Sequence, residues 1–297
     1  MNLQKGTLWH AIQRTSDHAL SLGAQLPIKT EYTFIEDGGM RFFVRILAGL
    51  EIKDAARRQQ AEKTAAGNTI DPFLPPEPDL VVGGISDTHS AVLNKYNVVE
   101  NHLLIITRKF EKQDMLLTLA DFEALWLCMA EYEGLVFYNG GREAGASQDH
   151  KHLQMVPLPL APEGPAIPIE PLLANAPRQG IGTIPGLPFQ HAFVRLGPDL
   201  ATAPREAAIK TFDLYGSLLQ RVHMSTWSAH GPTRQSCPYC LIITREWMLL
   251  VPRSREHFED ISFNSLAFAG SLFIRDHHQL DRLKAVGPLQ ALRIVAR

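Results

Sequence analysis

Short apolar segments with the character of β-strands outnumber the helical segments, and this feature constrains the fold of the chain most. Each segment is rich in branched or aromatic side chains and is bounded by glycine, proline or polar residues, as strands usually are. The expected strands are Met40–Leu47, Ala91–Lys95, His102–Thr107, Leu135–Asn139, His150–Leu158, Cys240–Thr244 and Met248–Pro252. Because they do not alternate regularly with helices, the pattern predicts an α+β fold.

Several longer segments have the apolar spacing of amphipathic helices. They are Leu8–Ser21, Thr118–Glu133, Arg205–His223 and most of Asn264–Ala296, with a break at Gly287-Pro288. The segment from Thr118 begins with Thr-x-x-Asp, which is the pattern of a capping box, so we expect its first turn to be capped by side chains.

Two proline-rich segments separate these elements. Pro72–Pro78 holds four prolines within seven residues. Neither a helix nor a central strand accommodates such a run, so we expect a surface excursion. Pro157–Pro204 is rich in proline and glycine without a sustained period. A connection of that length inside a compact domain is usually functional or a linker, and the sequence leaves open whether either segment covers a site.

The composition excludes several classes of protein. The 297 residues carry 29 Lys and Arg against 31 Asp and Glu, a formal net charge of -2, so we expect no nucleic-acid or membrane partner. Three cysteines are too few for a disulfide scaffold. The chain has neither an apolar run of membrane-spanning length nor an apolar N-terminal signal, so a cytoplasmic location is expected.

One internal similarity suggests two related halves. LLIITRKFE (Leu103–Glu111) resembles LLVPRSREHFE (Leu249–Glu259), and both are apolar strands that leave through a basic loop. Short apolar strands often resemble one another, so this similarity alone leaves an internal duplication open.

The residues able to carry chemistry are concentrated in Phe137–Pro157, FYNGGREAGASQDHKHLQMVP. If HKHLQMV is a strand, its side chains alternate, so His150, His152 and Gln154 share one face. Lys151 then points the other way. Two imidazoles and a primary amide on one face form a compact polar group.

A glycine-rich loop precedes the histidines and favours phosphate chemistry. Its glycines allow backbone N–H groups to approach an anion closely, and Arg142 and Lys151 add positive charge nearby. Neutral histidine is abundant at pH 7 and also departs readily, which suits a covalent phosphoramidate intermediate. An isolated His-x-His is equally compatible with metal ligands or buried core residues. Ser147 upstream and Gln154 downstream favour phosphate chemistry, because a metal site needs neither.

These motifs resemble those of a known family. Ser147-x-x-His150-x-His152-x-Gln154, with Asn139-Gly-Gly upstream, is similar to the active-site signature of the histidine-triad superfamily's transferase branch. Within that branch the segment GGREAGASQDHKHLQ resembles the corresponding segment of the diadenosine tetraphosphate phosphorylase (ATP adenylyltransferase) family. Further similarity lies in VLNKYNVVENHLLIITRKFEKQ and in WMLLVPRSRE followed by ISFNSLAFAGSLFIR. Together the similar segments span Arg41–Ala296.

The resemblance implies both a fold and a reaction. The implied fold has two fused histidine-triad-like halves, an antiparallel sheet and flanking helices, which we divide at residues 1–170 and 171–297. The implied reaction is phosphorolysis of diadenosine tetraphosphate by inorganic phosphate to ADP and ATP through an AMP-histidine. On this sequence the nucleophile would be His152, Gln154 would bond a non-bridging phosphoryl oxygen, and His150 would orient its neighbour through the backbone.

The resemblance also implies a set of substrate-binding residues. They are Lys53, Asn94, Lys95, Asn139, Gly145, Ala146, Ser147, Gln148, Asn264, Ser265, Leu266, Ser271 and Arg275. Arg275 stands where members often have lysine, and Ser271 where some have methionine. No metal site and no cofactor are expected, although Mg²⁺ would accompany the substrate polyphosphate.

Three alternatives remain at this stage. A related nucleotidyltransferase using a hexose 1-phosphate or adenylyl sulfate would carry nearly the same catalytic residues. A non-catalytic nucleotide-binding module would not need the nucleophile. Cys237-x-x-Cys240, with His223 and His230 upstream, has zinc-ligand spacing, although a Cys-x-x-Cys that runs into a strand more often buries small apolar side chains.

Overall fold

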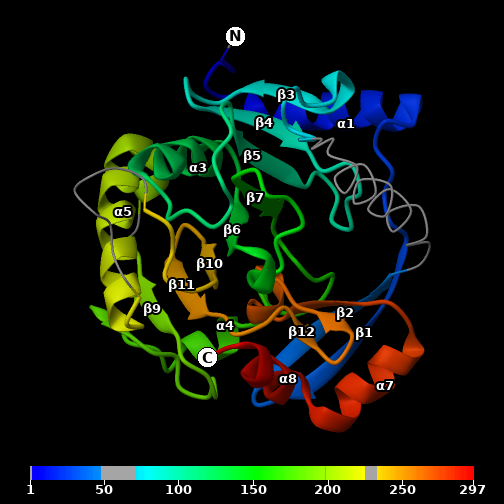
Figure 1. The fold of residues 1–297 in the computed structure, drawn as a ribbon, viewed down its shortest axis with the longest axis vertical. Helices are drawn as coiled ribbons and strands as arrows, with labels where there is room; N and C mark the ends of the chain where they lie inside the picture. Colours follow the sequence, from blue (N-terminus) through cyan, green and yellow to red (C-terminus); the bar gives the residue numbers. More distant parts are fainter. Residues whose placement is uncertain (1, 48–70, 198, 225–232) are drawn as a thin grey trace.

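The structure is an α+β fold built on a large central sheet (Figure 1). This computed structural model describes residues 2–47, 71–197, 199–224 and 233–297. The central sheet has nine strands in the order β3-β4-β5-β7-β6-β10-β11-β9-β8, with every neighbouring pair antiparallel. Its strands are β3 (Val81–Gly84), β4 (His89–Leu93), β5 (Leu103–Thr107), β6 (Gly134–Gly140), β7 (His152–Pro157), β8 (Ile181–Gly182), β9 (Ala192–Arg195), β10 (Tyr239–Ile243) and β11 (Trp247–Pro252).

Two smaller sheets and a set of helices complete the fold. Strands β1 (Thr30–Asp37), β2 (Met40–Leu47) and β14 (Ser271–Ile274) form a three-stranded sheet in which β14 runs parallel to β2, and β12 (His257–Phe258) pairs with β13 (Ile261–Ser262). The α-helices are α1 (Leu8–Leu22), α3 (Leu119–Glu131), α4 (Glu170–Leu173), α5 (Pro204–Arg221), α6 (Ser265–Phe268), α7 (His277–Val286) and α8 (Pro288–Val295). Short 3-10 helices are η1 (Pro78–Leu80), η2 (Arg142–Ala144) and η3 (Leu200–Thr202).

The central sheet separates two hydrophobic cores. Alternate residues of one strand enter different cores. Leu241 of β10 belongs to the core that includes α1, α3 and α5, whereas Ile242 belongs to the core that includes α6, α7, α8 and β2. The second core takes side chains from β6, β7, β9, β10 and β11 but, among the described residues, none from β3, β4 or β5. The second core therefore lies against the strands from β7 to β9, whereas the buried apolar residues of β4 and β5 belong to the first core.

The strand order shows two related halves. The units β5–α3–β6–β7 and β9–α5–β10–β11 have the same connectivity and lie in mirrored order, meeting where β6 pairs with β10. The hypothesis of two halves is thus supported, but the alignment suggested by the sequence similarity was wrong, because it matched β5 with β11 instead of β9. The boundary between residues 170 and 171 stays a prediction.

Most predicted elements are confirmed, with corrections at short strands. The strand at Met40–Leu47, the helix break at Gly287 and the capping box of α3 occur as predicted. Strands β1, β3, β8, β9, β12, β13 and β14 were missed, and β14 lies inside a segment that we expected to be mostly helical. Pro157–Pro204 is not a linker, because it supplies α4, β8 and β9. None of the helices in the described ranges has both the length and the apolarity needed to span a membrane.

Candidate active site

His152 and Gln154 lie on one face of β7, between β5 and β6. Ile106 of β5 lies opposite His152, and Leu104 of β5 lies opposite Gln154. Phe137 of β6 flanks Gln154 on its other side. The predicted alternation is therefore confirmed for this pair, although β7 begins at His152 and not at His150.

The imidazole of His152 is held in the tautomer that a nucleophile requires. Its Nδ1 lies 2.8 Å from the carbonyl oxygen of His150, and since a carbonyl can only accept, Nδ1 carries the proton and donates it. Nε2 then holds the lone pair, and no described residue bonds it. Burial lowers the pKa of His152 to about 4, so the ring is neutral at pH 7.

A buried glutamine that the sequence analysis did not identify fixes the backbone of His152. The Oε1 atom of Gln113 accepts the N–H of His152 at 2.8 Å, and its Nε2 donates to the carbonyl oxygens of His152 at 3.1 Å and Asn139 at 2.9 Å. One side chain therefore replaces the ladder hydrogen bonds where β6 and β7 separate. No local sequence pattern points to this role.

His150 lies just before β7 in a closed environment. Its Nδ1 lies 2.7 Å from Asp71 Oδ2, and its Nε2 lies 2.8 Å from the carbonyl oxygen of Thr107. Nε2 also lies 2.9 Å from the hydroxyl of Thr107, so both ring nitrogens have polar partners within the protein. The ring of Phe73 lies edge-on to both His150 and His152, at centroid distances of 5.5 and 5.4 Å. The segment that begins the proline-rich excursion thus packs against the two histidines.

Lys151 does not contribute charge to this face, and that prediction was wrong. Its side chain is fully buried on the opposite side, where Nζ lies 2.7 Å from Asp121 and 3.1 Å from Glu111. Burial alone would lower its pKa, but the two carboxylates raise the pKa above its usual value. The charge of Lys151 is therefore already neutralised beneath the sheet.

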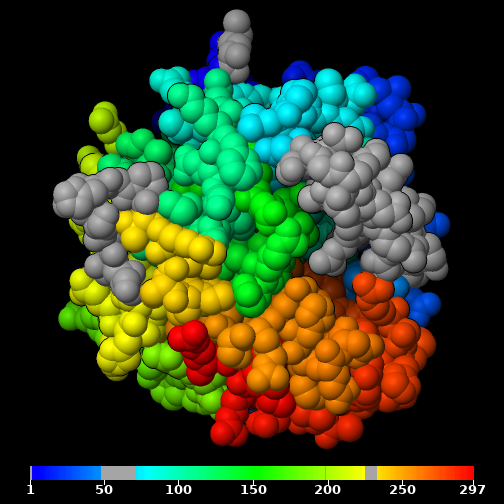
Figure 2. All heavy atoms as spheres, in the orientation of Figure 1, coloured from blue at the N-terminus to red at the C-terminus, as the bar shows by residue number. Residues whose placement is uncertain are grey.

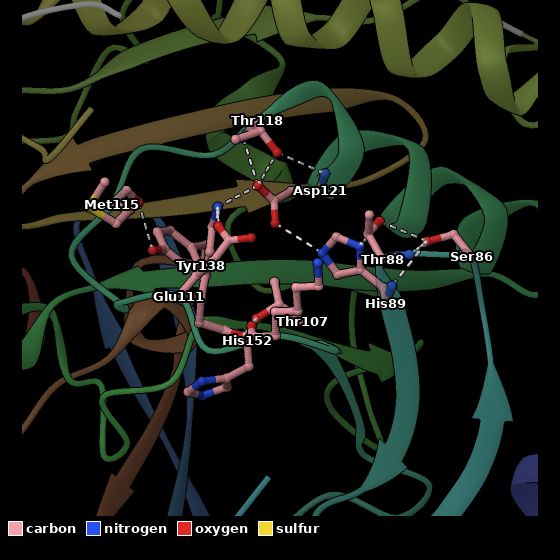
Figure 3. Close-up of polar contacts among 12 residues, drawn as sticks. Ser86, Thr88, His89, Thr107, Glu111, Met115, Thr118, Asp121, Tyr138 and His152 are labelled. Carbon is pink, nitrogen blue, oxygen red and sulfur yellow. Dashed lines mark hydrogen bonds and ion pairs between the residues drawn. The ribbon is translucent and has the colours of Figure 1, made fainter. Parts of the chain in front are cut away.

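Asp121 joins Lys151 to the first turn of α3 and to β4. Figure 3 shows its contacts with Thr118 and His89. The carboxylate accepts the N–H and hydroxyl of Thr118 at 2.6 and 2.8 Å and lies 3.0 Å from Nε2 of His89. Although burial alone would raise the pKa of Asp121, Lys151 and His89 hold it well below its usual range. In Figure 3 the ring of His152 points away from this cluster. We conclude that the cluster anchors α3 under β7.

The glycine-rich loop after β6 turns through two residues in the left-handed region. Gly141 and Gly145 both have φ of +92°, which favours glycine, and η2 lies between them. The loop is closed by hydrogen bonds within it, from the N–H of Gly145 to Arg142 and from that of Ala146 to Gly141. Ser147 is exposed and bonds no described residue, whereas Arg142 is paired with Asp149 at 2.8 Å. The loop therefore leaves the hydroxyl of Ser147 exposed to solvent.

The structure places this loop and the end of β6 against Asn264 and Ser265, two of the predicted substrate-binding residues. A Cβ on Gly145 would lie 2.9 Å from the Cα of Asn264, so only glycine allows the approach. Asn264 caps α6 by accepting the N–H of Leu266, and Ser265 donates both its N–H and its hydroxyl to Oδ1 of Asn139. Figure 2 shows the green atoms of the glycine loop beside the orange atoms of the C-terminal segment on one face.

The two ends of the Asn139 side-chain amide differ in their hydrogen bonding. Its oxygen is committed to Ser265, at 2.9 Å from the N–H and 2.6 Å from the hydroxyl. Its Nδ2 donates to no described residue. Ser265, whose hydroxyl also reaches the carbonyl oxygen of Tyr138, is fully buried, so its direct role here is to hold α6 on β6.

The remaining predicted residues lie farther from this group or have other partners. Leu266 is buried in the second core, Ala146 is buried within the loop, and Gln148 follows Ser147. Ser271 accepts from buried Arg45 at 2.8 Å, and Arg275 is exposed after β14. Asn94 and Lys95 follow β4, where Asn94 lies 3.3 Å from His102 and Lys95 is paired with Glu77 at 2.7 Å. Lys53 lies outside the described residues.

The structure gives no support to a zinc site at the Cys-x-x-Cys. Cys237 belongs to the first core and Cys240 to the second, so the two side chains lie on opposite faces of the sheet. His230 lies outside the described residues. Within the part of the chain that the structure describes, no group of three or more His, Cys, Asp or Glu could hold a metal ion.

Comparisons with known proteins agree along the whole chain. The family model described as "Ap4A phosphorylase N-terminal domain" matches residues 1–175, and the one described as "ATP adenylyltransferase C-terminal domain" matches residues 185–297. Diadenosine 5',5'''-P1,P4-tetraphosphate phosphorylase 2 of Saccharomyces cerevisiae is 29% identical over 252 residues, covering 77% of this chain and 76% of the relative. Protein APA1 of the same yeast is 29% identical over 245 residues, covering 75% of each chain.

A solved structure has the same fold. The crystal structure of yeast Ap4A phosphorylase Apa2 matches 100% of this chain and 95% of its own, with a TM-score of 0.76 and 23% identity. The structure of that enzyme in complex with Ap4A gives a TM-score of 0.77 at 21% identity, covering 100% of this chain and 98% of the other.

Proposed function

The chain belongs to the Ap4A phosphorylase family, and from that premise we propose that it cleaves diadenosine tetraphosphate with inorganic phosphate to give ADP and ATP. The observation that carries the proposal is the free Nε2 of a neutral, buried His152 on the same strand face as Gln154. Beside them lies a glycine-rich loop that presents an exposed serine.

The first step is nucleophilic attack by Nε2 of His152 on the α-phosphorus. An N–P bond forms and the bond from the α-phosphorus to the bridging oxygen breaks, so ATP leaves and AMP stays on the histidine. The leaving oxygen belongs to a polyphosphate and needs no proton. The positive charge that develops on the ring is stabilised because Nδ1 donates to the carbonyl oxygen of His150.

The second step regenerates the enzyme. An oxygen of inorganic phosphate attacks the same phosphorus, the N–P bond breaks, and ADP is released with the electron pair returned to Nε2. Two inversions at phosphorus give net retention. A neutral amide at Gln154 suits this cycle, because it donates to a phosphoryl oxygen without supplying a base that would activate water.

Neighbouring donors would hold the phosphate groups. Nδ2 of Asn139 and the hydroxyl of Ser147 have no partner among the described residues, and both belong to β6 or the loop that follows it. Any Mg²⁺ would arrive with the polyphosphate as part of the substrate. We also place the enzyme in the cytoplasm, since its cysteines, Cys128, Cys237 and Cys240, are all free thiols.

Product analysis tests this function directly. The purified chain is incubated with diadenosine tetraphosphate, with and without inorganic phosphate, and the nucleotides are separated. We expect ADP plus ATP only when phosphate is present. AMP plus ATP without phosphate would identify a hydrolase. No turnover would contradict the substrate, in which case hexose 1-phosphate and adenylyl sulfate are the next substrates to test.

A further inference from the structure

A buried arginine with no acidic partner lies next to the two loops that form the candidate phosphate-binding group. Arg253 follows β11, and its side chain is 0% exposed. No described carboxylate pairs with it. Its guanidinium instead donates to five carbonyl oxygens, those of Val295 at 3.1 Å, Phe263 at 3.0 Å, Ala144 at 3.4 Å, Arg255 at 2.8 Å and Glu256 at 3.3 Å.

Burying a guanidinium without an opposite charge costs free energy that a purely structural residue need not incur. A buried charge is normally paired with an opposite charge, as Lys151 is with Asp121 in the same molecule. Arg253 is satisfied by dipoles alone, with the ring of Phe268 below it at 5.1 Å from its Cζ. The positive charge therefore remains uncompensated beneath the surface.

The acceptors of Arg253 place this charge under both loops. Nη1 bonds Ala144, which precedes Gly145, and Phe263, which precedes Asn264. Gly145 and Asn264 are the residues at which the two loops touch. The planar fork can serve several acceptors at fixed angles, which the single ammonium of a lysine cannot do.

We propose that Arg253 is a positioning residue of the polyphosphate site, whose guanidinium holds the glycine-rich loop and the Asn264 loop together and gives their common base a positive charge. The proposal rests on the proposed function in one respect, that these loops receive the phosphate groups of the nucleotide. It predicts that replacing Arg253 weakens binding of the phosphate groups of a nucleotide and leaves binding of its nucleoside unchanged.

Calorimetry tests this by comparing the affinities of wild type and Arg253→Met for ATP and for adenosine, which lacks the phosphates. We expect the affinity for ATP to fall by about tenfold or more, as for the loss of a charge-assisted contact, and the affinity for adenosine to stay within about twofold. An equal loss for both ligands would show a merely structural role and overturn the proposal. So would unchanged ATP binding, or a wild-type protein that does not bind ATP.

Two further variants make the test decisive. Arg245→Met removes another arginine that donates to a carbonyl oxygen, that of Met129, and should leave ATP binding unchanged. If Arg253→Met does not fold, Arg253→Lys takes its place, with a several-fold loss for ATP expected and wild-type affinity overturning the proposal. A wild-type protein that binds ATP yet does not cleave diadenosine tetraphosphate would refute the proposed function and leave this inference standing.

Discussion

The two halves of the molecule have equivalent strands, but the side chains on the equivalent face are polar in β7 and apolar in β11. The pairing of β6 with β7 starts at Gly134↔Pro157, and that of β10 with β11 starts at Tyr239↔Pro252. Counting back from the two prolines makes His152 equivalent to Trp247 and Gln154 equivalent to Leu249. Trp247 and Leu249 are buried in the second core. The two strands therefore share a place in the fold and differ in the side chains that this face carries.

The difference shows how one scaffold serves two purposes. In the second half the equivalent face is filled with apolar side chains and covered by α6, α7 and α8, so it supports the fold. The segment that leaves β11, including Arg253, then reaches back to the loop beside the first half. In the first half no described residue of β4 or β5 joins that core, and the equivalent face carries His152 and Gln154 in place of the apolar pair.

Replacing the nucleophile should have the largest effect. His152→Ala is expected to lower phosphorolysis by on the order of 10⁴-fold or more while the protein stays folded, because the ring bonds only one carbonyl. Steady-state assays and circular dichroism check this. Near wild-type turnover would refute the role of His152.

The matched control is His191. Its Nδ1 also lies 2.8 Å from a carbonyl two residues earlier, but its Nε2 accepts the N–H of Ile184 at 2.7 Å. We expect His191→Ala to retain turnover and to lose stability, because that buried N–H loses its acceptor. The pair therefore distinguishes a histidine with a free nitrogen from one that is fully bonded.

The sequence predicted the parts of this site that follow local rules. Alternation placed His152 with Gln154, and the capping box at Thr118 was readable from four residues. Contacts across long separations were not readable: the bonds of Gln113 and Asp71 and the carboxylate partners of Lys151 depend on elements brought together only by the sheet. Alternation did predict that Lys151 points away from His152. Short strands such as β9 and β14 were missed because four residues carry too little periodicity.

Replacing Lys151 should have the second largest effect, which we expect in the free energy of unfolding and not in turnover. Lys151→Met removes the ammonium partner of the buried Asp121 carboxylate, which we expect to cost about 3 to 5 kcal/mol in the free energy of unfolding. The equivalent residue in the second half is Glu246, which is exposed, so Glu246→Met should change stability by less than about 0.5 kcal/mol. Urea unfolding of both variants measures the difference, and equal effects would contradict it.

Acid should reveal the remaining difference between the two sides of β7. The pKa of His152 is about 4 in the folded protein and near 6.5 when unfolded, so between these values the unfolded chain binds a proton that the folded chain excludes. The free energy of unfolding should therefore fall as pH drops from about 6.5 to 4, by up to about 3 kcal/mol from this residue.

The same acid range should leave the Lys151–Asp121 pair intact. The depressed pKa of Asp121 contributes stability that is lost only as pH falls through that depressed value, which lies below this range. In His152→Asn the acid-induced loss should accordingly be smaller than in wild type, as measured by urea unfolding at pH 7, 5.5 and 4. His191, whose pKa burial also lowers, contributes to both proteins and cancels in the difference. If the free energy of unfolding fell equally with pH in wild type and in His152→Asn, His152 would not be held neutral by burial.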